Sequence, residues 1–323
     1  MIEIGHTVAQ VLSREDWLAL HRKPGIITAS MVSTILGINK WCSPFTLYQR
    51  FIGDVPWQET TIRMRKGHQL EPLVADLYEE ETGRTLTDPG DYAVYWHPDY
   101  EWLLCTLDRL TVDERDKQGV VEMKAPGEFR AKEWREGPPL EHQVQVQVQM
   151  AILGTEWGSI AGLVGGEFFH PDVERHDKVL AAMWPRLAEF RDRVLAHDPP
   201  PEDGSDSTTA TLKVLHPQDS GNTIFVAGLG ELWHKRARLK EDQGDAKKGL
   251  QEVENQIRGA LGENTFAKDE LTQVSYKTQS RRGYLKVEPS DDTKARLSDA
   301  GIAFKETKSS TCRVLREVKR HGD

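Results

Sequence analysis

Residues 102–124 read WLLCTLDRLTVDERDKQGVVEMK, and the interpretation of the whole chain begins from them. Two apolar runs, at 102–112 and 119–123, flank a polar connector at 113–118. Short apolar runs around a polar turn are typical of a β-hairpin. The stretch therefore predicts two adjacent antiparallel strands in the core of the protein.

The second strand of this hairpin carries residues that suggest chemistry. Strand side chains alternate between two faces, so Glu122 and Lys124 are expected on one face and Val121 and Met123 on the other. Folding the hairpin back brings the carboxylate of Asp108 beside Glu122. Two carboxylates next to a lysine can hold a hard cation such as Mg²⁺, which takes oxygen ligands and keeps several waters.

An acidic residue two positions before a lysine is a weak motif in a chain this charged. The same triplet begins at Asp245, Asp292, Glu306 and Glu317. Only the copy at Glu122 follows an apparent core strand and has an acidic residue on the strand before it. The alternative is a solvated hairpin face with a surface ion pair, and the hairpin alone does not decide between the two.

The composition restricts the class and the compartment of the protein. The chain has 323 residues, enough for two domains or for one large domain with an extension. It contains no apolar segment of membrane-spanning length, and residues 1–16 lack a secretory apolar region, so we expect a cytoplasmic protein without membrane association. Cys42, Cys105 and Cys312 are too few and too far apart for a zinc cluster, an iron–sulfur cluster or a disulfide framework.

The charge is distributed unevenly along the chain. The formal net charge is −9, and it divides into −13 for residues 1–207 and +4 for residues 208–323. This balance argues against nonspecific coating of nucleic acid, so DNA contacts by the first part must come from locally placed cations. Residues 199–211, rich in Pro, Gly, Ser and acidic side chains, predict a linker between a domain at 1–198 and an extension at 212–323.

Two short helices are predicted before the hairpin. The first follows Ile27, with Thr28 or Ser30 as its N-cap and Gly37 at its end. Its N-terminus could bind a phosphate, with Lys23 close by, although for Ser30 taken alone a plain helix cap is the favoured interpretation.

The second helix starts near residue 70 and has apolar residues at helical spacing: Leu70, Leu73, Val74, Leu77 and Tyr78. Pro72 suits its first turn and Gly83 its C-terminal cap. Glu71 then lies at the N-terminus, where the helix dipole favours a carboxylate. Its alternative role is a further acidic group at a metal site.

The segment after the hairpin is ambiguous in sequence. Gln143, Gln145, Gln147 and Gln149 alternate with valines, which fits an amphipathic strand and also a core helix whose glutamines need partners. Further elements are predicted as follows: a core strand at 159–169, an amphipathic helix at 179–195, one or two helices at 231–261 and short strands at 272–277, 284–287 and 312–318.

The first two of these strands and their connection carry a basic and aromatic cluster. Arg281, Arg282 and Lys286, with Tyr276 and Tyr284 interleaved, could contact nucleic acid. A solvated hairpin is the simpler interpretation.

Five motifs in order resemble a known family: ITAS at 27–30, the GxxLEP pattern at 67–72, Asp108, Glu122-Met123-Lys124 and QVQVQM at 145–150. Together they resemble the YqaJ-type viral recombinases, which are similar to phage lambda exonuclease and belong to the PD-(D/E)XK nucleases. The resemblance covers about residues 20–195. It implies an α/β fold, a restriction-endonuclease-like core with a central mixed sheet flanked by helices, followed here by a C-terminal α+β extension.

The resemblance also implies roles for individual residues. Asp108 and Glu122 would be metal ligands, joined by Glu71 and by the main-chain carbonyl of Met123. Lys124 would orient or help deprotonate the attacking water and offset charge in the transition state.

Further implied residues lie outside the hairpin. Gln145 would come from a helix beside the site, which favours helix for the ambiguous segment. By position, Lys23, Ser30 and Arg130 match the family's contacts to a 5′-terminal phosphate. Lys23 stands where lambda exonuclease has arginine, which would replace a bidentate grip with a point charge.

The chain also departs from the family beside the catalytic aspartate. The family often has Pro before and Gly after this residue, where Leu107 and Arg109 stand here. The geometry of the turn around Asp108 is therefore not implied by the resemblance.

The resemblance implies an Mg²⁺-dependent exonuclease, with Mn²⁺ as the alternative ion, that digests the 5′-ended strand of linear double-stranded DNA. The 3′ overhang would serve phage-type homologous recombination. A ring-shaped homotrimer, a single-strand annealing partner and a phage or prophage origin in a bacterial cytoplasm are implied as well. The competing hypotheses are an endonuclease of the same superfamily and a non-catalytic module that binds DNA or loads a partner.

Overall fold

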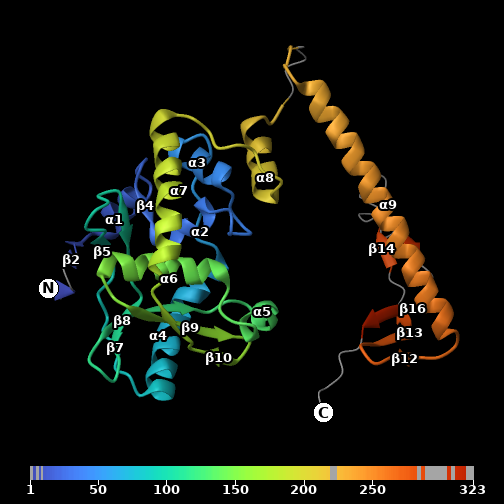
Figure 1. Ribbon diagram of the computed structural model, residues 1–323, viewed down its shortest axis with the longest axis horizontal. Coiled ribbons are helices and arrows are strands. Elements are labelled where there is room, and N and C mark those ends of the chain that lie inside the picture. The colour runs from blue at the N-terminus through green and yellow to red at the C-terminus, as the bar shows by residue number, and fades with distance from the viewer. Residues whose placement is uncertain are drawn as a thin grey trace, which may run out of the picture. The chain divides into compact units, whose positions relative to one another are not determined.

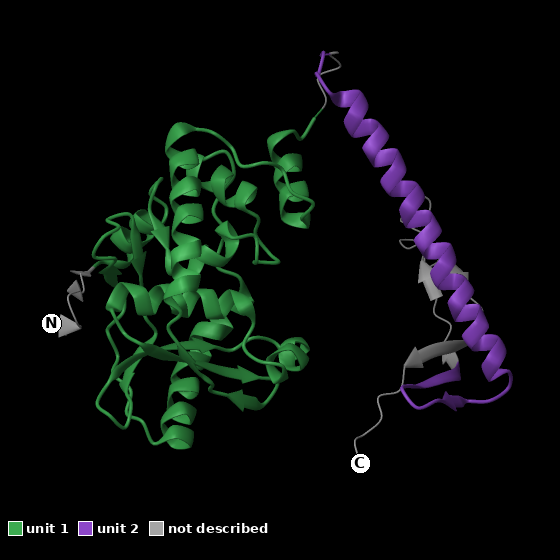
Figure 2. Ribbon diagram, viewed as in Figure 1, with its two compact units in different colours: residues 1–221 green, residues 222–323 purple. Residues whose placement is uncertain are grey.

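The computed structural model describes residues 3–4, 7–8, 10–218, 224–281, 285–287, 304–306 and 310–317. The chain divides into two compact units, residues 1–221 and 222–323 (Figure 2).

The main sheet of the first unit consists of β7 (Arg109–Val112), β8 (Gln118–Lys124), β9 (Trp157–Val164), β10 (Glu167–Phe169) and β11 (Asp172–Glu174). β7 and β8 are antiparallel, which confirms the predicted hairpin, whereas β8 and β9 are parallel. The sheet is therefore mixed, as expected for the fold class. The predicted strand at 159–169 is a β9–β10 hairpin instead, because two glycines with positive φ, Gly165 and Gly166, turn the chain.

A second sheet has the order β3 (Gln10–Val11), β5 (Ala93–Trp96), β6 (Leu103–Cys105) and β4 (Ile27–Thr28). A two-stranded pair, β1 (Glu3–Ile4) and β2 (Thr7–Val8), precedes it. The first run of the hairpin, 102–112, is thus not one strand. It leaves the second sheet after β6 and enters the main sheet at β7, and Asp108 lies in the connection between them.

Helices cover both faces of the main sheet (Figure 1). α6 (Leu140–Leu153) contacts β8 and β9 on one face, so the glutamine-rich segment is a helix. α4 (Ile62–Thr82) contacts the same strands from the other face. The alternation of β8 follows this layering, because Val120 packs in the cluster with the valines of α6 and Val121 packs in the cluster with Tyr78 of α4.

α4 begins earlier than the sequence predicts. Thr61 caps it by accepting a hydrogen bond from the amide of Met64, and Pro72 lies inside the helix rather than in its first turn. Glu71 is therefore in the middle of the helix and does not benefit from the N-terminal dipole. Gly83, at φ 69°, ends the helix as predicted.

The other helical elements of this unit are α1 (Arg14–His21), η1 (Ala29–Met31), α2 (Val32–Ile35), α3 (Pro44–Ile52), η2 (Glu128–Arg130), α5 (Ala131–Arg135), α7 (Asp177–Ala196) and α8 (Asp206–Leu215). α7 confirms the helix predicted at 179–195, and its apolar side is buried. The predicted capped helix after Ile27 is wrong in detail: β4 and one 3₁₀ turn precede a four-residue helix, and the side chain of Thr28 makes no capping bond.

α8 occupies part of the segment that the sequence predicts as a linker. Buried hydroxyl groups attach it to α3, since Thr208 donates to Ser43 at 2.8 Å and Thr46 and Thr211 lie 2.8 Å apart. The compact first unit consequently extends beyond the predicted linker at 199–211. Composition missed this helix because its contacts are made by Ser and Thr, residues that are also common in loops.

The second unit starts with one long helix, α9 (Leu229–Leu261). Its strands are β12 (Phe266–Lys268), β13 (Gln273–Arg281), β14 (Leu285–Val287), β15 (Phe304–Glu306) and β16 (Ser310–Glu317). β13 lies between β12 and β16, and β14 pairs with β15. Of the predicted basic and aromatic cluster, Arg282 and Tyr284 lie outside the described residues.

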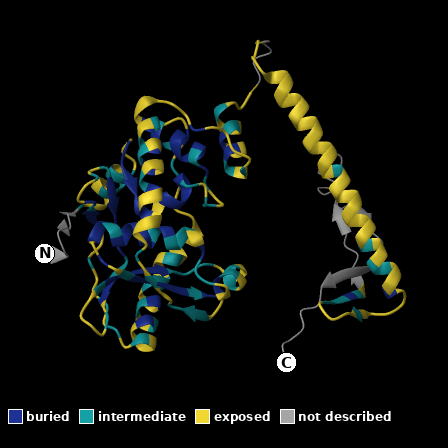
Figure 3. Cartoon of the chain, viewed as in Figure 1, coloured by how far each residue is buried: buried dark blue, intermediate teal, exposed yellow. Residues whose placement is uncertain are grey.

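Burial differs between the two units (Figure 3). The first has a continuous apolar core around α6, whereas α9 exposes most of its length. Within the described part of the chain, no helix is both long enough and apolar enough to cross a bilayer.

Candidate functional site

Asp108 and Glu122 come together at the end of the β7–β8 ladder. Arg109 pairs with Val121, so continuing the antiparallel register by one residue places Asp108 opposite Glu122. The amide of Met123 donates to Oδ2 of Asp108 at 2.7 Å, which fixes the carboxylate beside β8. Burial and the neighbouring charge of Glu122 raise the pKa of Asp108 to about 7. The two carboxylates predicted to converge therefore interact.

Glu122 is held by three side-chain donors. The side-chain amide of Gln145 donates to Oε1 and that of Gln149 to Oε2, each at 2.6 Å. Lys124 forms an ion pair with Oε1. Because Glu122 is only 2% exposed, these bonds replace the water that a buried carboxylate would otherwise need.

Lys124 is a cation in this arrangement. Burial would lower its pKa, but the charges of Glu122 and Asp108 outweigh burial and raise it above the ordinary value for lysine. A lysine that acts as a base needs a lowered pKa. In this state Lys124 is suited to neutralise charge and to orient a nucleophile.

Glu71 lies within electrostatic range of the pair but is held by another partner. Its charge raises the pKa of both Asp108 and Lys124, while its Oε1 bonds Nδ1 of His68 at 2.9 Å. The same bond raises the pKa of His68. Glu71, the predicted third acidic group, is thus near the site on α4 and is hydrogen-bonded to His68, a residue that the sequence pattern did not indicate.

The carboxylate pair fits a hard divalent cation. Asp108 and Glu122 place two like charges in a largely buried site, where Lys124 is the cation that lowers the pKa of Asp108. A bound divalent ion would reduce the repulsion between the two carboxylates. Among the described residues, His, Cys, Asp and Glu side chains form no group of three that could hold a metal ion. Asp108 and Glu122 would therefore supply the protein's side chains, which suits Mg²⁺ because it commonly takes one or two carboxylates with water and substrate phosphate.

The predicted phosphate contacts have different surroundings. Lys23 is exposed, and Oγ of Ser30 lies 2.9 Å from Oγ1 of Thr28. Arg130 is bound by Glu133 at 2.9 Å and by Glu141 at 2.6 Å. No described hydrogen bond or ion pair joins Lys23, Ser30 and Arg130 to one another, so the phosphate pocket stays a prediction.

His142 connects the surroundings of Lys124 and Arg130. Burial, with a smaller contribution from these two cations, lowers the pKa of His142 to about 3. Its ring is therefore neutral, and Nε2 is buried without a hydrogen-bond partner among the described residues. Both cations therefore act on His142, and Arg130 bonds Glu141, the residue before His142 in α6.

Gln149 is the site residue that the sequence analysis missed. It lies one helical turn after Gln145, on the same face of α6, and a spacing of four residues could have indicated this. Its side-chain amide also lies 3.3 Å from the carbonyl of Thr106, next to the chain that leads to Asp108. Gln149 therefore connects both carboxylate-bearing segments.

Replacing Gln149 by leucine is expected to slow the DNA hydrolysis that the resemblance implies about 10- to 100-fold, because Glu122 loses the donor to one of its oxygens. Gln147→Leu is the matched control: Gln147 is also buried on α6, but it bonds the backbone of Glu174 and His176, at 2.6 and 2.7 Å. The control should lower the unfolding free energy by about 1–2 kcal/mol and leave kcat unchanged. Equal kcat values for both variants would contradict a positioning role for Gln149.

Comparison with solved structures finds partial similarity. An alkaline exonuclease from Laribacter hongkongensis is 26% identical with a TM-score of 0.46, covering 57% of this chain and 94% of that one. A phage-related exonuclease from Haemophilus somnus is 11% identical with a TM-score of 0.41, covering 53% and 96%.

Sequence comparison identifies the family. The model of the YqaJ-like viral recombinase domain matches residues 16–156, which include the β7–β8 hairpin and α6. The protein YqaJ of Bacillus subtilis is 32% identical over 255 residues, covering 76% of this chain and 78% of YqaJ. The chain therefore belongs to the YqaJ-like viral recombinase family.

Proposed function

We propose that the protein is an Mg²⁺-dependent exonuclease that digests the 5′-ended strand of linear double-stranded DNA and leaves a 3′ overhang for recombination. The observation that carries the proposal is the interacting pair of Asp108 and Glu122, with Lys124 bonded to Glu122. Membership of a viral recombinase family supports DNA as the substrate. Digestion from the 5′ end and the overhang rest on the resemblance to lambda exonuclease.

The residues of the site would divide the work of phosphodiester hydrolysis. Asp108 and Glu122 would hold the ion, with the main-chain carbonyl of Met123 as a further predicted ligand. Glu71, also predicted as a ligand, forms no metal-binding group of three with them among the described residues and would act from α4 through its charge. Bound Mg²⁺ would polarise the phosphate and favour ionisation of water. Lys124, as a cation, would orient the water and offset the charge that develops on the phosphate.

Two glutamines would keep this arrangement in place. Gln145 and Gln149 each fix one oxygen of Glu122, so the carboxylate does not have to reorganise when an ion and a substrate bind. Both lie on α6, which is packed against the sheet. A rigid helix is a better support for such bonds than a loop.

End recognition would involve the residues around Arg130. Its Nε and one terminal nitrogen bond Glu133 and Glu141, while Nη1 forms no hydrogen bond among the described residues. The N–H groups of Nη1 are thus available to donate to a phosphate oxygen. Lys23 and Ser30 are exposed and would complete the predicted pocket.

The test uses three duplexes of equal sequence: linear with 5′-phosphates, linear with 5′-hydroxyls and covalently closed circular. We expect Mg²⁺-dependent loss of the 5′-ended strand of the phosphorylated linear duplex, slower digestion of the hydroxyl form, no cleavage of the circle and no reaction in chelator. Cleavage of the circle would favour an endonuclease. Intact linear DNA in Mg²⁺ would refute nuclease activity and favour a DNA-binding or loading module.

A ring-shaped homotrimer and a single-strand annealing partner belong to the same proposal. They rest on the resemblance, and they are tested by the solution mass of the chain and by co-purification.

A further inference from the structure

The helix α9 carries a stripe with a seven-residue repeat, in which eight of ten positions are apolar and Arg236 and Gln243 are polar. The first position of the repeat is occupied by Leu229, Arg236, Gln243, Leu250 and Ile257. The fourth position is occupied by Leu232, Leu239, Ala246, Val253 and Ala260. Alternating steps of three and four residues keep these side chains on one side of the helix, which is the pattern of a coiled-coil seam.

The stripe is exposed. Five of its large apolar side chains are more than half exposed to solvent: Leu229 at 53%, Leu232 at 62%, Leu239 at 58%, Leu250 at 61% and Val253 at 52%. Towards the end of α9, Ile257 and Arg258 are partly covered, and Leu261 is the one buried residue of this helix. A line of exposed large apolar side chains marks an interaction site.

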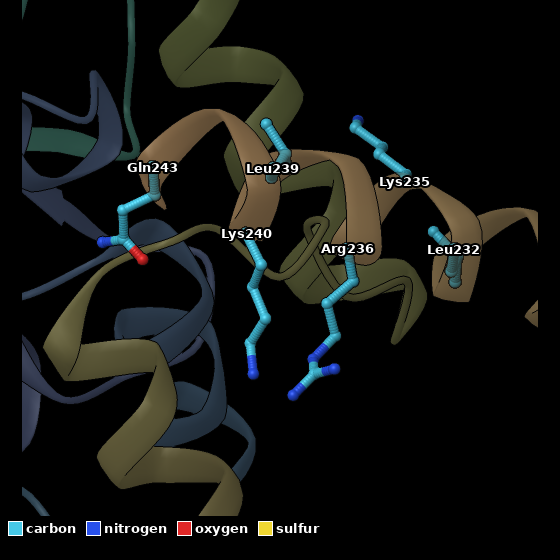
Figure 4. Close-up of a pocket in the computed structure, with 6 residues that line it drawn as sticks. All are labelled: Leu232, Lys235, Arg236, Leu239, Lys240 and Gln243. Carbon is cyan, nitrogen blue, oxygen red and sulfur yellow. The ribbon is translucent and has the colours of Figure 1, made fainter. Parts of the chain in front are cut away.

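A shallow, open hollow lies on the stripe between Leu232 and Gln243. Six side chains line this hollow: Leu232, Lys235, Arg236, Leu239, Lys240 and Gln243 (Figure 4). They form two consecutive groups of four, 232-235-236-239 and 236-239-240-243. In a coiled coil, each such group is a hole that accepts one side chain of the facing helix.

The composition of α9 also indicates that it needs a partner. Four glycines, at positions 230, 244, 249 and 259, lower its intrinsic stability, and none of them lies on the stripe. Helices in proteins depend mainly on packing of an apolar face. A helix of 33 residues, about 50 Å long, with an unpacked face would lack this support.

We propose that α9 packs through this stripe against α9 of a second copy of the chain. The same repeat in two copies is self-complementary, because each presents the apolar residues and the holes that the other requires. Charge agrees with this occupant: residues 229–240 carry a net +3, and residues 250–261, which lie opposite them in an antiparallel pair, carry a net −1. A DNA partner would contact only the basic side chains of α9 and would leave the apolar side chains of the stripe exposed to water.

The test compares three forms of the full chain by analytical ultracentrifugation. Leu239→Asp with Leu250→Asp places two charges on the stripe. Ala237→Asp with Gln251→Asp is the matched control, because it adds the same charge to the same helix at exposed positions off the stripe. We expect the wild-type chain and the control to share one mass above that of a single chain at about 10 µM, and the stripe variant to have a smaller mass.

The comparison separates α9 from other contacts. Association through residues 1–221 is common to all three forms and cannot lower the mass of one selectively. Equal masses for all three forms, or a wild-type chain that is a monomer at this concentration, would overturn the proposal. Circular dichroism with equal helix content in both variants excludes unfolding as the cause, and the result is independent of nuclease activity.

Discussion

Glu122→Gln is expected to reduce Mg²⁺-dependent hydrolysis of linear duplex DNA by at least about 1,000-fold. Glutamine keeps the size of the side chain but removes the charge that would hold the ion. Gln145 and Gln149 each donate to one oxygen of Glu122, and glutamine would present an amide to one of these donors. The rate of loss of an end-labelled strand under single-turnover conditions measures the effect.

Glu114→Gln is the control for this substitution. Glu114 lies in the turn of the same β7–β8 hairpin and is exposed, so the same chemical change should leave the rate within about twofold. A DNA-binding assay in chelator should give similar affinities for both variants, which assigns the loss to chemistry. Full activity of Glu122→Gln would exclude the carboxylate pair as the catalytic site.

The hairpin could be predicted because its information is local. Apolar runs around a polar turn specify β7 and β8, and alternation along β8 specifies that Glu122 and Lys124 share a face. The convergence of Asp108 with Glu122 follows from register, since Arg109 pairs with Val121, and the amide of Met123 holds the Asp108 carboxylate beside β8. Nothing local, however, indicates that β6 and β7 belong to different sheets.

The glutamine-rich segment shows where local pattern fails. Alternating Gln and Val fits both a strand and a helix. In the structure α6 is buried on more than one side, which explains why apolar residues occupy more than one face of this helix. The functional glutamines are then those that face Glu122, namely Gln145 and Gln149. Gln147 has the same local pattern and bonds a distant backbone.

The sequence does not predict two charge pairs near the site. The resemblance assigns Arg130 to a phosphate by position, but its carboxylate partners include Glu141 at the start of α6, beyond α5 and the loop that follows it. His68 binds Glu71 only because both lie in one long helix that starts at Ile62 instead of near residue 70. A terminal glutamate and a mid-helix glutamate look alike when the helix start is misplaced.

Asp108→Asn is expected to abolish activity and yet to stabilise the metal-free protein at pH 8, by about 2 kcal/mol. Burial and the charge of Glu122 raise the pKa of Asp108 to about 7, so its ionised form is unfavourable in the folded state. Asparagine removes this charge and still offers an oxygen to the amide of Met123. The figure is less than the shift alone would give, because Asp108 is partly exposed.

The sign of the pH dependence follows from proton binding. Between about pH 4 and 7 the folded state retains the Asp108 proton while the unfolded state, with an ordinary pKa near 4, has lost it. The folded state binds more protons, so this contribution to stability falls as pH rises through the window and stays low above it. In chelator, the advantage of Asp108→Asn over wild type should therefore be larger at pH 8 than at pH 5.

Chemical denaturation at both pH values, with and without Mg²⁺, measures these differences. Asp76→Asn is the control, because Asp76 is exposed on α4 and should give no stabilisation at either pH. Mg²⁺ should stabilise wild type more than Asp108→Asn, because an ion that binds only the folded state adds to its stability and the variant has lost a ligand. An Asp108→Asn protein that is less stable than wild type at pH 8 in chelator would contradict the raised pKa of Asp108, and the electrostatic argument for a cation at this site would fail with it.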